Sequence, residues 1–276
     1  MLRTRVVTAL VLVPLALWLV WLAPTAVLPG AFSLVIALSG WEWGRLAGLE
    51  GAAVRGGYAA ACTALSVGAW ALVAAGVPVK ALVWVALAWW LVPIVRLALF
   101  SGRGSVAADA LSGAATLTSA SIAVFAVHLR ADDGALWLTL LLVLVWGADV
   151  GGYFAGRRWG GRRLAPTVSP GKTWAGVWGG ISLGLLCAVV VYVLARLAGL
   201  GASVPGISGL IGLGVAAIAM SVVGDLFESM IKRLRGHKDS GHLLPGHGGI
   251  LDRIDGLLAA APVVGAAAMM LGGTHA

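Results

Sequence analysis

The sequence predicts an all-α protein, a polytopic integral membrane helical bundle of about nine transmembrane helices. Of its 276 residues, 60% are hydrophobic and 11% are charged, whereas a soluble domain has roughly 45 to 50% and about 25%. The hydrophobic residues also form long blocks that approach or exceed the ~20 residues needed for a helix to cross a bilayer. Together, these observations exclude an ordinary water-soluble domain.

The first apolar block follows Arg3 and Arg5 and ends near Ala23. It is longer than the apolar region of a cleaved signal peptide, which has about 7 to 15 residues, so we expect it to remain as a span. In chain order the expected spans are 6–23, 25–43, 58–77, 81–100, 111–129, 135–156, 174–200, 207–227 and 250–272. The span 111–129 is the weakest because it is rich in Ser and Thr. If it only dips into the bilayer, the C-terminus changes sides.

The loops between these spans alternate in charge, and this alternation predicts the orientation. Arg and Lys gather in every second loop, most densely in 157–173 and 229–250, while the other loops are nearly uncharged. The positive-inside rule then places the N-terminus and both basic loops in the cytoplasm and the C-terminus outside. Orientation explains the net charge of +8 without a nucleic-acid partner. The Ala, Gly and Arg bias suggests a multi-pass protein of a bacterial inner membrane.

We expect a single membrane domain over residues 1–276, with N-terminal helices in 1–134 and catalytic helices in 135–276. Two polar segments, 149–173 and 225–255, hold six of the eleven acidic residues. Cys62 and Cys187 lie in apolar blocks without metal-site spacing, so neither a disulfide nor a zinc site is expected.

Five acids lie in or beside apolar helices, where a carboxylate costs roughly 2.5 to 3.5 kcal/mol and is usually functional. They are Asp149, Asp225, Glu228, Asp252 and Asp255. Acids three residues apart share a helix face, so Asp225 with Glu228 and Asp252 with Asp255 form a negative pocket. Carboxylates without cysteine favour Mg²⁺, with room for a second cation. The alternative is a structural ion-pair network with Lys232, Arg233 and Arg253.

A possible phosphate site precedes the seventh span. Gly171-Lys172-Thr173 resembles the end of a P-loop, but Pro166 stands where that pattern needs glycine. We expect Ser169 to cap the helix and Pro170 to occupy its first position, so that free backbone N–H groups and Lys172 face an anion. The alternative is an ordinary helix cap in a basic loop.

Glycines mark two further features. In the loop 236–249, Gly248 and Gly249 allow close approach to a ligand, and His247 lies between glycines near the acidic pair. In the seventh span, Gly176, Gly180 and Gly184 recur every fourth residue. This spacing suits close helix packing within the bundle or between subunits and hints at a homodimer.

The stretch from Ser229 to Asp255 resembles the C-terminal motif of the phosphatidate cytidylyltransferases, the CDP-diacylglycerol synthases. Further stretches resemble that family as well, over nearly the whole chain: Trp41–Trp43, Asp149 with Gly152 and Tyr153, Ser169–Thr173 and Gly224–Glu228.

The resemblance implies a magnesium-dependent reaction in which CTP and phosphatidic acid give CDP-diacylglycerol and pyrophosphate. The attacking lipid phosphate is already ionised, so catalysis would consist mainly of positioning and charge stabilisation. Asp225 and Asp252 would hold the metal, with Asp149, Glu228 and Asp255 nearby. Lys172 and Arg253 complete the expected catalytic set. The expected substrate-binding residues are Ser169, Thr173, Lys232, Arg233, Lys238, Asp239, His247, Gly248 and Gly249.

Two other functions remain open at this point. One is a related CTP-dependent enzyme acting on another membrane lipid, such as a polyprenol kinase or an isoprenoid-phosphate cytidylyltransferase. The other is an ion-coupled transporter with Asp149 and Asp225 as cation sites. The basic residues at the cytoplasmic helix ends suit a phosphorylated substrate better than an ion path.

Overall fold

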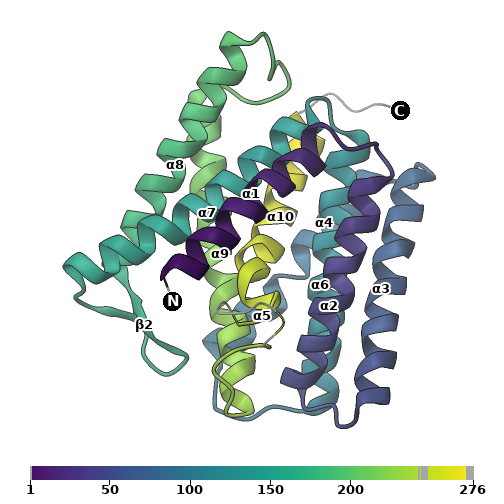
Figure 1. The fold of residues 1–276 in the computed structure, drawn as a ribbon, viewed down its shortest axis with the longest axis vertical. Helices are drawn as coiled ribbons and strands as arrows, with labels where there is room; N and C mark the ends of the chain where they lie inside the picture. The colour runs from purple at the N-terminus through teal and green to yellow at the C-terminus, as the bar shows by residue number, and fades with distance from the viewer. Residues whose placement is uncertain (1, 242, 244–247, 272–276) are drawn as a thin grey trace.

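The computed structural model describes the backbone of residues 2–241, 243 and 248–271, and side chains from residue 11 onward. It is a bundle of long helices with one short β-hairpin (Figure 1). The elements are α1 (Leu2–Trp21), α2 (Val27–Ala47), α3 (Ala52–Ala74), α4 (Val79–Ala88), α5 (Leu91–Ala98), α6 (Val106–Arg130), α7 (Gly134–Trp159), β1 (Arg163–Ala165), β2 (Ser169–Thr173), α8 (Trp174–Leu197), α9 (Ile207–Leu234) and α10 (Leu251–Leu271).

The expected membrane fold is confirmed. Within the described residues, seven helical segments are long and apolar enough to cross a membrane: α3, α4 with α5, and α6 to α10. With α1 and α2, they correspond one to one with the expected spans. α6 is one continuous helix of 25 residues, so the weakest expected span has the length of a full crossing. Several of its hydroxyl groups donate to carbonyls of the same helix, as when Ser121 donates to the carbonyl of Leu117 at 2.8 Å.

The structure corrects the expected boundaries in three places. The expected span 81–100 is broken at Trp89 and Trp90, because Pro93 cannot donate to the carbonyl of Trp89 and its ring crowds it. The loop expected at 229–250 begins later, since α9 continues to Leu234. The loop expected at 157–173 contains the end of α7 and an antiparallel hairpin, in which Arg163 pairs with Thr173 and Ala165 with Ser169.

Helices α7 and α8 cross at backbone distance. A Cβ atom added to Gly180 would lie 2.8 Å from the carbonyl oxygen of Ala148, and one added to Gly184 would lie 2.7 Å from that of Leu144. Gly176 meets the carbonyl of Gly152 in the same way, at 3.0 Å. The regular glycines of α8 are therefore used within the chain, and they no longer support a homodimer, which stays a prediction.

The core nearest the polar segments is built around aromatic rings. Trp43 of α2 and Trp90, just before α5, both pack against Phe227 of α9, with ring centroids 5.9 and 6.4 Å apart. Fully buried Asp109 of α6 forms ion pairs with Arg96 at 2.5 Å and with Arg235 at 3.0 Å. These contacts fix the end of α9, from which the glycine-rich loop leads to α10.

Candidate active site

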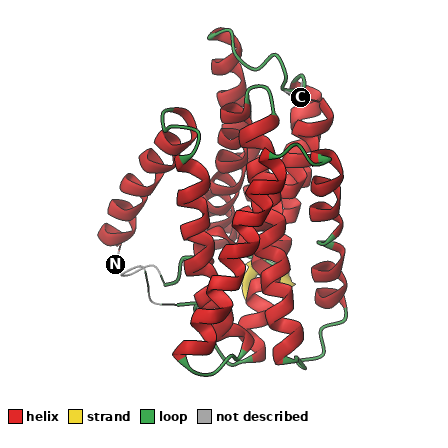
Figure 2. Cartoon of the chain, turned by 90° about the vertical axis from the view of Figure 1, so that its right-hand side faces the viewer, coloured by secondary structure: helices red, strands yellow, loops and turns green. Residues whose placement is uncertain are grey.

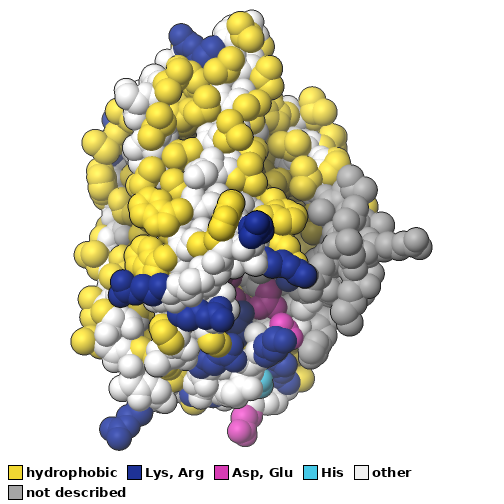
Figure 3. Space-filling view, turned by 90° about the vertical axis from the view of Figure 1, so that its left-hand side faces the viewer, with side chains coloured by type: hydrophobic (Ala, Val, Ile, Leu, Met, Phe, Trp, Pro, Cys, Tyr) yellow, Lys and Arg dark blue, Asp and Glu magenta, His cyan; other side chains and the backbone are white. Residues whose placement is uncertain are grey.

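A cleft of about 500 Å³ lies between α7, the hairpin, α8 and α9. We call it the open cleft. Its polar lining comes from Asp149, Lys172, Thr173 and Asp225, with Arg157 and Arg163 at the rim. Figure 3 shows acidic side chains in a hollow surrounded by Lys and Arg, below a broad hydrophobic surface. A cleft with this charge pattern suits an anionic ligand that is accompanied by a cation.

The central contact of the open cleft is an ion pair between Lys172 Nζ and Asp225 Oδ2, 2.5 Å apart. The two side chains keep 24% and 35% of their surface exposed, so a ligand can reach both. Ser229, one turn further along α9, donates to Asp225 Oδ1 at 3.3 Å. Asp149 lines the same cleft from α7. The structure thus brings together three of the expected site residues from three separate elements.

The hairpin explains how Lys172 reaches Asp225. Because β2 runs directly into α8, Lys172 is held one residue before the cap of that helix. The capping residue is Thr173, whose hydroxyl accepts a hydrogen bond from the Gly176 N–H at 3.1 Å. The expected helix start at Ser169 and Pro170 is therefore wrong. Both residues belong to strand β2 instead, since pairing with β1 keeps the chain extended up to Thr173.

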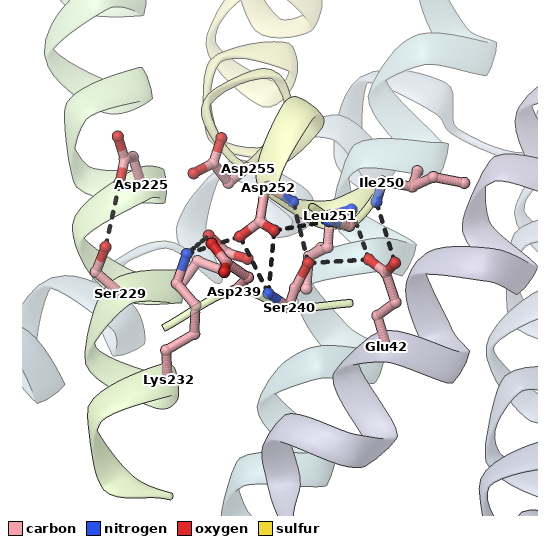
Figure 4. Close-up of polar contacts among 12 residues, drawn as sticks. Glu42, Asp225, Ser229, Lys232, Asp239, Ser240, Ile250, Leu251, Asp252 and Asp255 are labelled. Atoms are coloured by element: carbon pink, nitrogen blue, oxygen red, sulfur yellow. Dashed lines mark hydrogen bonds and ion pairs between the residues drawn. The ribbon is translucent and has the colours of Figure 1, made fainter. Parts of the chain in front are cut away.

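A second group of acids forms hydrogen bonds and ion pairs with other groups of the protein. We call Glu42, Glu228, Lys232, Ser240 and Asp252 the loop network (Figure 4). Lys232 Nζ donates to Glu228 Oε2 at 2.7 Å and to Asp252 Oδ1 at 2.9 Å. The Asp252 Oδ2 atom accepts from the Ser240 N–H at 3.0 Å and the Gly249 N–H at 2.9 Å. The pair between Glu228 and Lys232 matches the ion-pair alternative that the sequence left open. That alternative placed Asp252 with Arg253, whereas the structure also pairs Asp252 with Lys232.

Glu42 anchors the loop network from the N-terminal half of the chain. Its buried carboxylate accepts from Ser240 Oγ at 3.0 Å, from the Ile250 N–H at 3.1 Å and from the Leu251 N–H at 2.9 Å. The last two groups are donors at the start of α10 that would otherwise lack partners. Arg45, one turn further along α2, donates to the carbonyls of Asp239 and Ser240 at 2.6 and 3.1 Å.

Glycine is needed where the loop passes Glu42 and Asp252. A Cβ added to Gly249 would lie 2.4 Å from Glu42 Oε2, and one added to Gly241 would lie 2.2 Å from Glu42 Oε1. Gly248 has a positive φ of 84°. Partial burial and the nearby Arg45 guanidinium lower the pKa of His237, which lies at the start of this loop.

The remaining expected site residues are spread around these two groups. Asp255 lies on α10 close to Asp225 and Asp252 (Figure 4). Arg233 points to the hairpin, where its Nε donates to the carbonyl of Val168 at 3.2 Å. Lys238, Asp239 and Arg253 are exposed, and Ser169 is half-buried in β2; none of these four lines the open cleft. His247 lies outside the described residues.

Sequence reasoning gave no role to Glu42, Arg45 or Ser240, and it placed Arg157 and Arg163 only in the basic cluster of the possible phosphate site beside Lys172. Glu42 carried a usable signal, since it is an acid within an otherwise apolar helix, like Asp149. Within the described part of the chain, no three Asp, Glu, His or Cys side chains converge as a metal site.

Comparisons with known proteins agree with this picture. The profile of the Cytidylyltransferase family matches residues 3–271. A phosphatidate cytidylyltransferase of Pseudomonas aeruginosa is 41% identical over 96% of both chains, and one of Brucella suis is 35% identical over 95% of this chain and 92% of its own. A third, from Haemophilus influenzae, is 51% identical over 47% of this chain and 44% of its own. The resemblance found in the motifs is thus confirmed, and the chain belongs to the cytidylyltransferase family.

Proposed function

We propose that this protein is a phosphatidate cytidylyltransferase that converts CTP and phosphatidic acid into CDP-diacylglycerol and pyrophosphate. The observation that carries the proposal is the open cleft itself. It combines Lys172, two carboxylates and an arginine rim at the level of membrane-spanning helices. A soluble nucleotide and a membrane lipid that both carry phosphate can meet in such a place. The named relatives support the choice of phosphatidate as the lipid.

The residues of the cleft fit Mg²⁺. This ion is usually bound by one or two carboxylates together with substrate phosphates and water, rather than by a cage of protein ligands. Asp149 and Asp225 line the cleft and would supply those two carboxylates, with Asp255 close to Asp225. When bound, the ion would neutralise charge on the CTP phosphates.

The loop network also holds acids that we predicted as metal ligands. Glu228 Oε1 is buried and accepts no hydrogen bond from the described residues. This atom is the one that a second cation would use. Asp252 remains a candidate ligand, although Lys232 and two backbone N–H groups occupy its oxygens.

The reaction needs no nucleophile from the protein. A phosphate oxygen of phosphatidate forms a bond to the α-phosphorus of CTP. The bond from that phosphorus to the oxygen bridging to the β-phosphorus breaks, and pyrophosphate leaves with the electron pair. Lys172, Arg157 and Arg163 would stabilise the charge that develops on the leaving pyrophosphate. Thr173 holds the start of α8, and with it Lys172, in place.

The substrate assignment can be tested with purified protein in detergent. We expect label from the α-phosphate of CTP to enter the lipid phase when phosphatidate and Mg²⁺ are present, and a chelator to abolish the transfer. A reaction without phosphatidate is the control. Label that enters the lipid only from the γ-phosphate, with a polyprenol acceptor, would mean a lipid kinase. No transfer from folded protein would overturn the proposal.

We also propose that the cleft faces the cytoplasm of a bacterial inner membrane, where CTP is present. The basic residues around the cleft support this orientation through the positive-inside rule. Single cysteines at exposed Lys238 and Ala202 test it in a background without Cys62 and Cys187. An impermeant thiol reagent should label Lys238→Cys in inverted vesicles and Ala202→Cys in right-side-out vesicles. The reverse pattern would contradict the orientation.

A further inference from the structure

A second cavity, of about 170 Å³, is lined by α1, α2, α6, α7 and α10. Its lining is made of apolar side chains, including Leu19, Phe32, Leu142 and Ile254. Helix α1 runs obliquely at the edge of the bundle (Figure 2), and many of its side chains are exposed. Near its end, the Trp21 ring N–H donates to Thr139 Oγ1 at 2.8 Å. We call this cavity the α1 groove.

The α1 groove lies in line with the open cleft. On α7, Leu138 and Leu142 line the groove, and Asp149 and Gly152 line the cleft. Residues separated by three, four or seven positions share one face of a helix, so all four lie on one stripe of α7. Val145 lies on the same stripe between the two cavities and is buried.

On α10, as on α7, a residue that lines the α1 groove lies near residues of the expected site. Ile254 of α10 lines the α1 groove, and its two chain neighbours are Arg253 and Asp255 of the expected site. The groove runs from there to Ala261, seven residues or about 10 Å along the helix axis. It therefore begins in the turn of α10 that carries the acids and leads away from the basic loops.

We propose that the α1 groove binds an acyl chain of the lipid substrate, with the phosphate of the same molecule in the open cleft. This inference rests on the proposed function. The groove offers only hydrocarbon contacts, so its occupant must be apolar. The groove also lies in line with a cleft that suits phosphates, which favours an occupant attached to a phosphate group. A phosphatidate molecule has both parts.

The groove would position the lipid phosphate for reaction, and it would contribute little to the affinity for the lipid. Lipid tails are about as apolar as leucine side chains, so moving an acyl chain from the bilayer into the groove gains little hydrophobic free energy. Instead, a seated chain holds the lipid phosphate at a fixed place relative to the α-phosphorus of CTP. A filled groove should therefore impair long-chain substrates and spare short-chain substrates.

The test compares Leu142→Trp, which fills the groove, with Leu34→Trp. Leu34 lies on α2 next to the groove residue Val35, but its own side chain is 61% exposed and faces away. Each protein is assayed with dioleoyl and dioctanoyl phosphatidate in mixed micelles. For Leu142→Trp we expect kcat/KM to fall roughly 10-fold to 100-fold with the dioleoyl substrate and to stay near wild type with the dioctanoyl substrate. Leu34→Trp should match wild type with both.

A photoreactive phosphatidate with a diazirine near the middle of one acyl chain provides a readout independent of turnover. We expect it to label α1, α2 or α10 in the wild-type protein, and to lose that labelling in Leu142→Trp. Labelling confined to the lipid-facing side of α8, or an unchanged chain-length profile in Leu142→Trp, would overturn the inference. If Leu142→Trp loses activity with both substrates, wild-type labelling decides. A wild type that uses neither phosphatidate refutes the proposed function instead.

Discussion

The open cleft and the loop network contain the same kinds of side chain, yet they differ in what is left for a ligand. In the cleft, Asp225 receives one lysine and the Ser229 hydroxyl, and the side chains of Lys172 and Asp225 keep part of their surface exposed. In the network, Asp252 receives a lysine and two backbone N–H groups, and Glu42 receives three donors. An acid within a membrane bundle can thus serve chemistry or architecture. The number of donors that the chain itself provides indicates which.

The largest effect is expected from a substitution that alters the open cleft and leaves the loop network intact. Asp225→Asn removes the charge that faces Lys172 while keeping the shape of the side chain. We expect kcat to fall about a thousandfold with an unchanged unfolding temperature, measured by the α-phosphate transfer assay and by thermal unfolding in detergent. Glu50→Gln, at an exposed acid outside the site, is the control. Near-normal turnover in Asp225→Asn would refute the role of the cleft.

The next effect concerns stability and arises in the network. Lys232→Met leaves Glu228 and Asp252 buried without their shared cation, which should cost about 3 kcal/mol or more. Adding Glu228→Gln removes one of the stranded charges and should recover part of the loss. Unfolding followed by tryptophan fluorescence measures both variants. A double variant that is no more stable than Lys232→Met would contradict the pairing.

A smaller effect is expected at Glu42, where only part of the acceptor capacity is removed. Glu42→Gln keeps one oxygen but turns an amide group towards a donor, and loss of one hydrogen bond to a charged group costs about 2 kcal/mol. Hydrogen exchange should rise in residues 248–251, where α10 begins. Exchange as slow as in wild type would show that Glu42 does not hold the loop.

The smallest effect is expected from a substitution at a single glycine of the loop that carries the loop network. Gly248→Ala places a side chain at a positive φ and 2.9 Å from Asp252 Oδ2, so we expect a loss of about 1 kcal/mol and a few-fold lower kcat. Gly171→Ala is the matched control, because its added Cβ has open space and lies beside the cleft. Equal behaviour of the two variants would remove the special role of Gly248.

Much of the fold was predictable from the sequence. Crossing a bilayer needs long apolar runs, so each expected span corresponds to a helical segment of the structure. The break before Pro93 follows from a rule that was not applied to the span 81–100. The hairpin was missed because a strand pair of three and five residues in a polar loop leaves no hydrophobic period to detect.

The members of the site were predictable, and so was the pair of Glu228 with Lys232, one turn apart on α9, but the pairs between different elements were not. Asp149 and Asp225 attract attention as charges beside apolar helices. That Lys172 pairs with Asp225 depends on how the hairpin meets α9, and that Lys232 also pairs with Asp252 depends on how α10 meets α9. Glu42 and Ser240 are 198 residues apart, and no local pattern connects them.

The backbone contact between α7 and α8 has a consequence for how the protein can evolve. The angle between these helices, and with it the width of the open cleft, is set by main-chain atoms meeting at Gly151, Gly179, Gly180 and Gly184. Most lipid-facing side chains of α8 are free to drift, because they do not touch that contact. These four glycines are not free to change, because even one added methyl group would push the helices apart. The shape of the open cleft is thus maintained by residues that have no side chain.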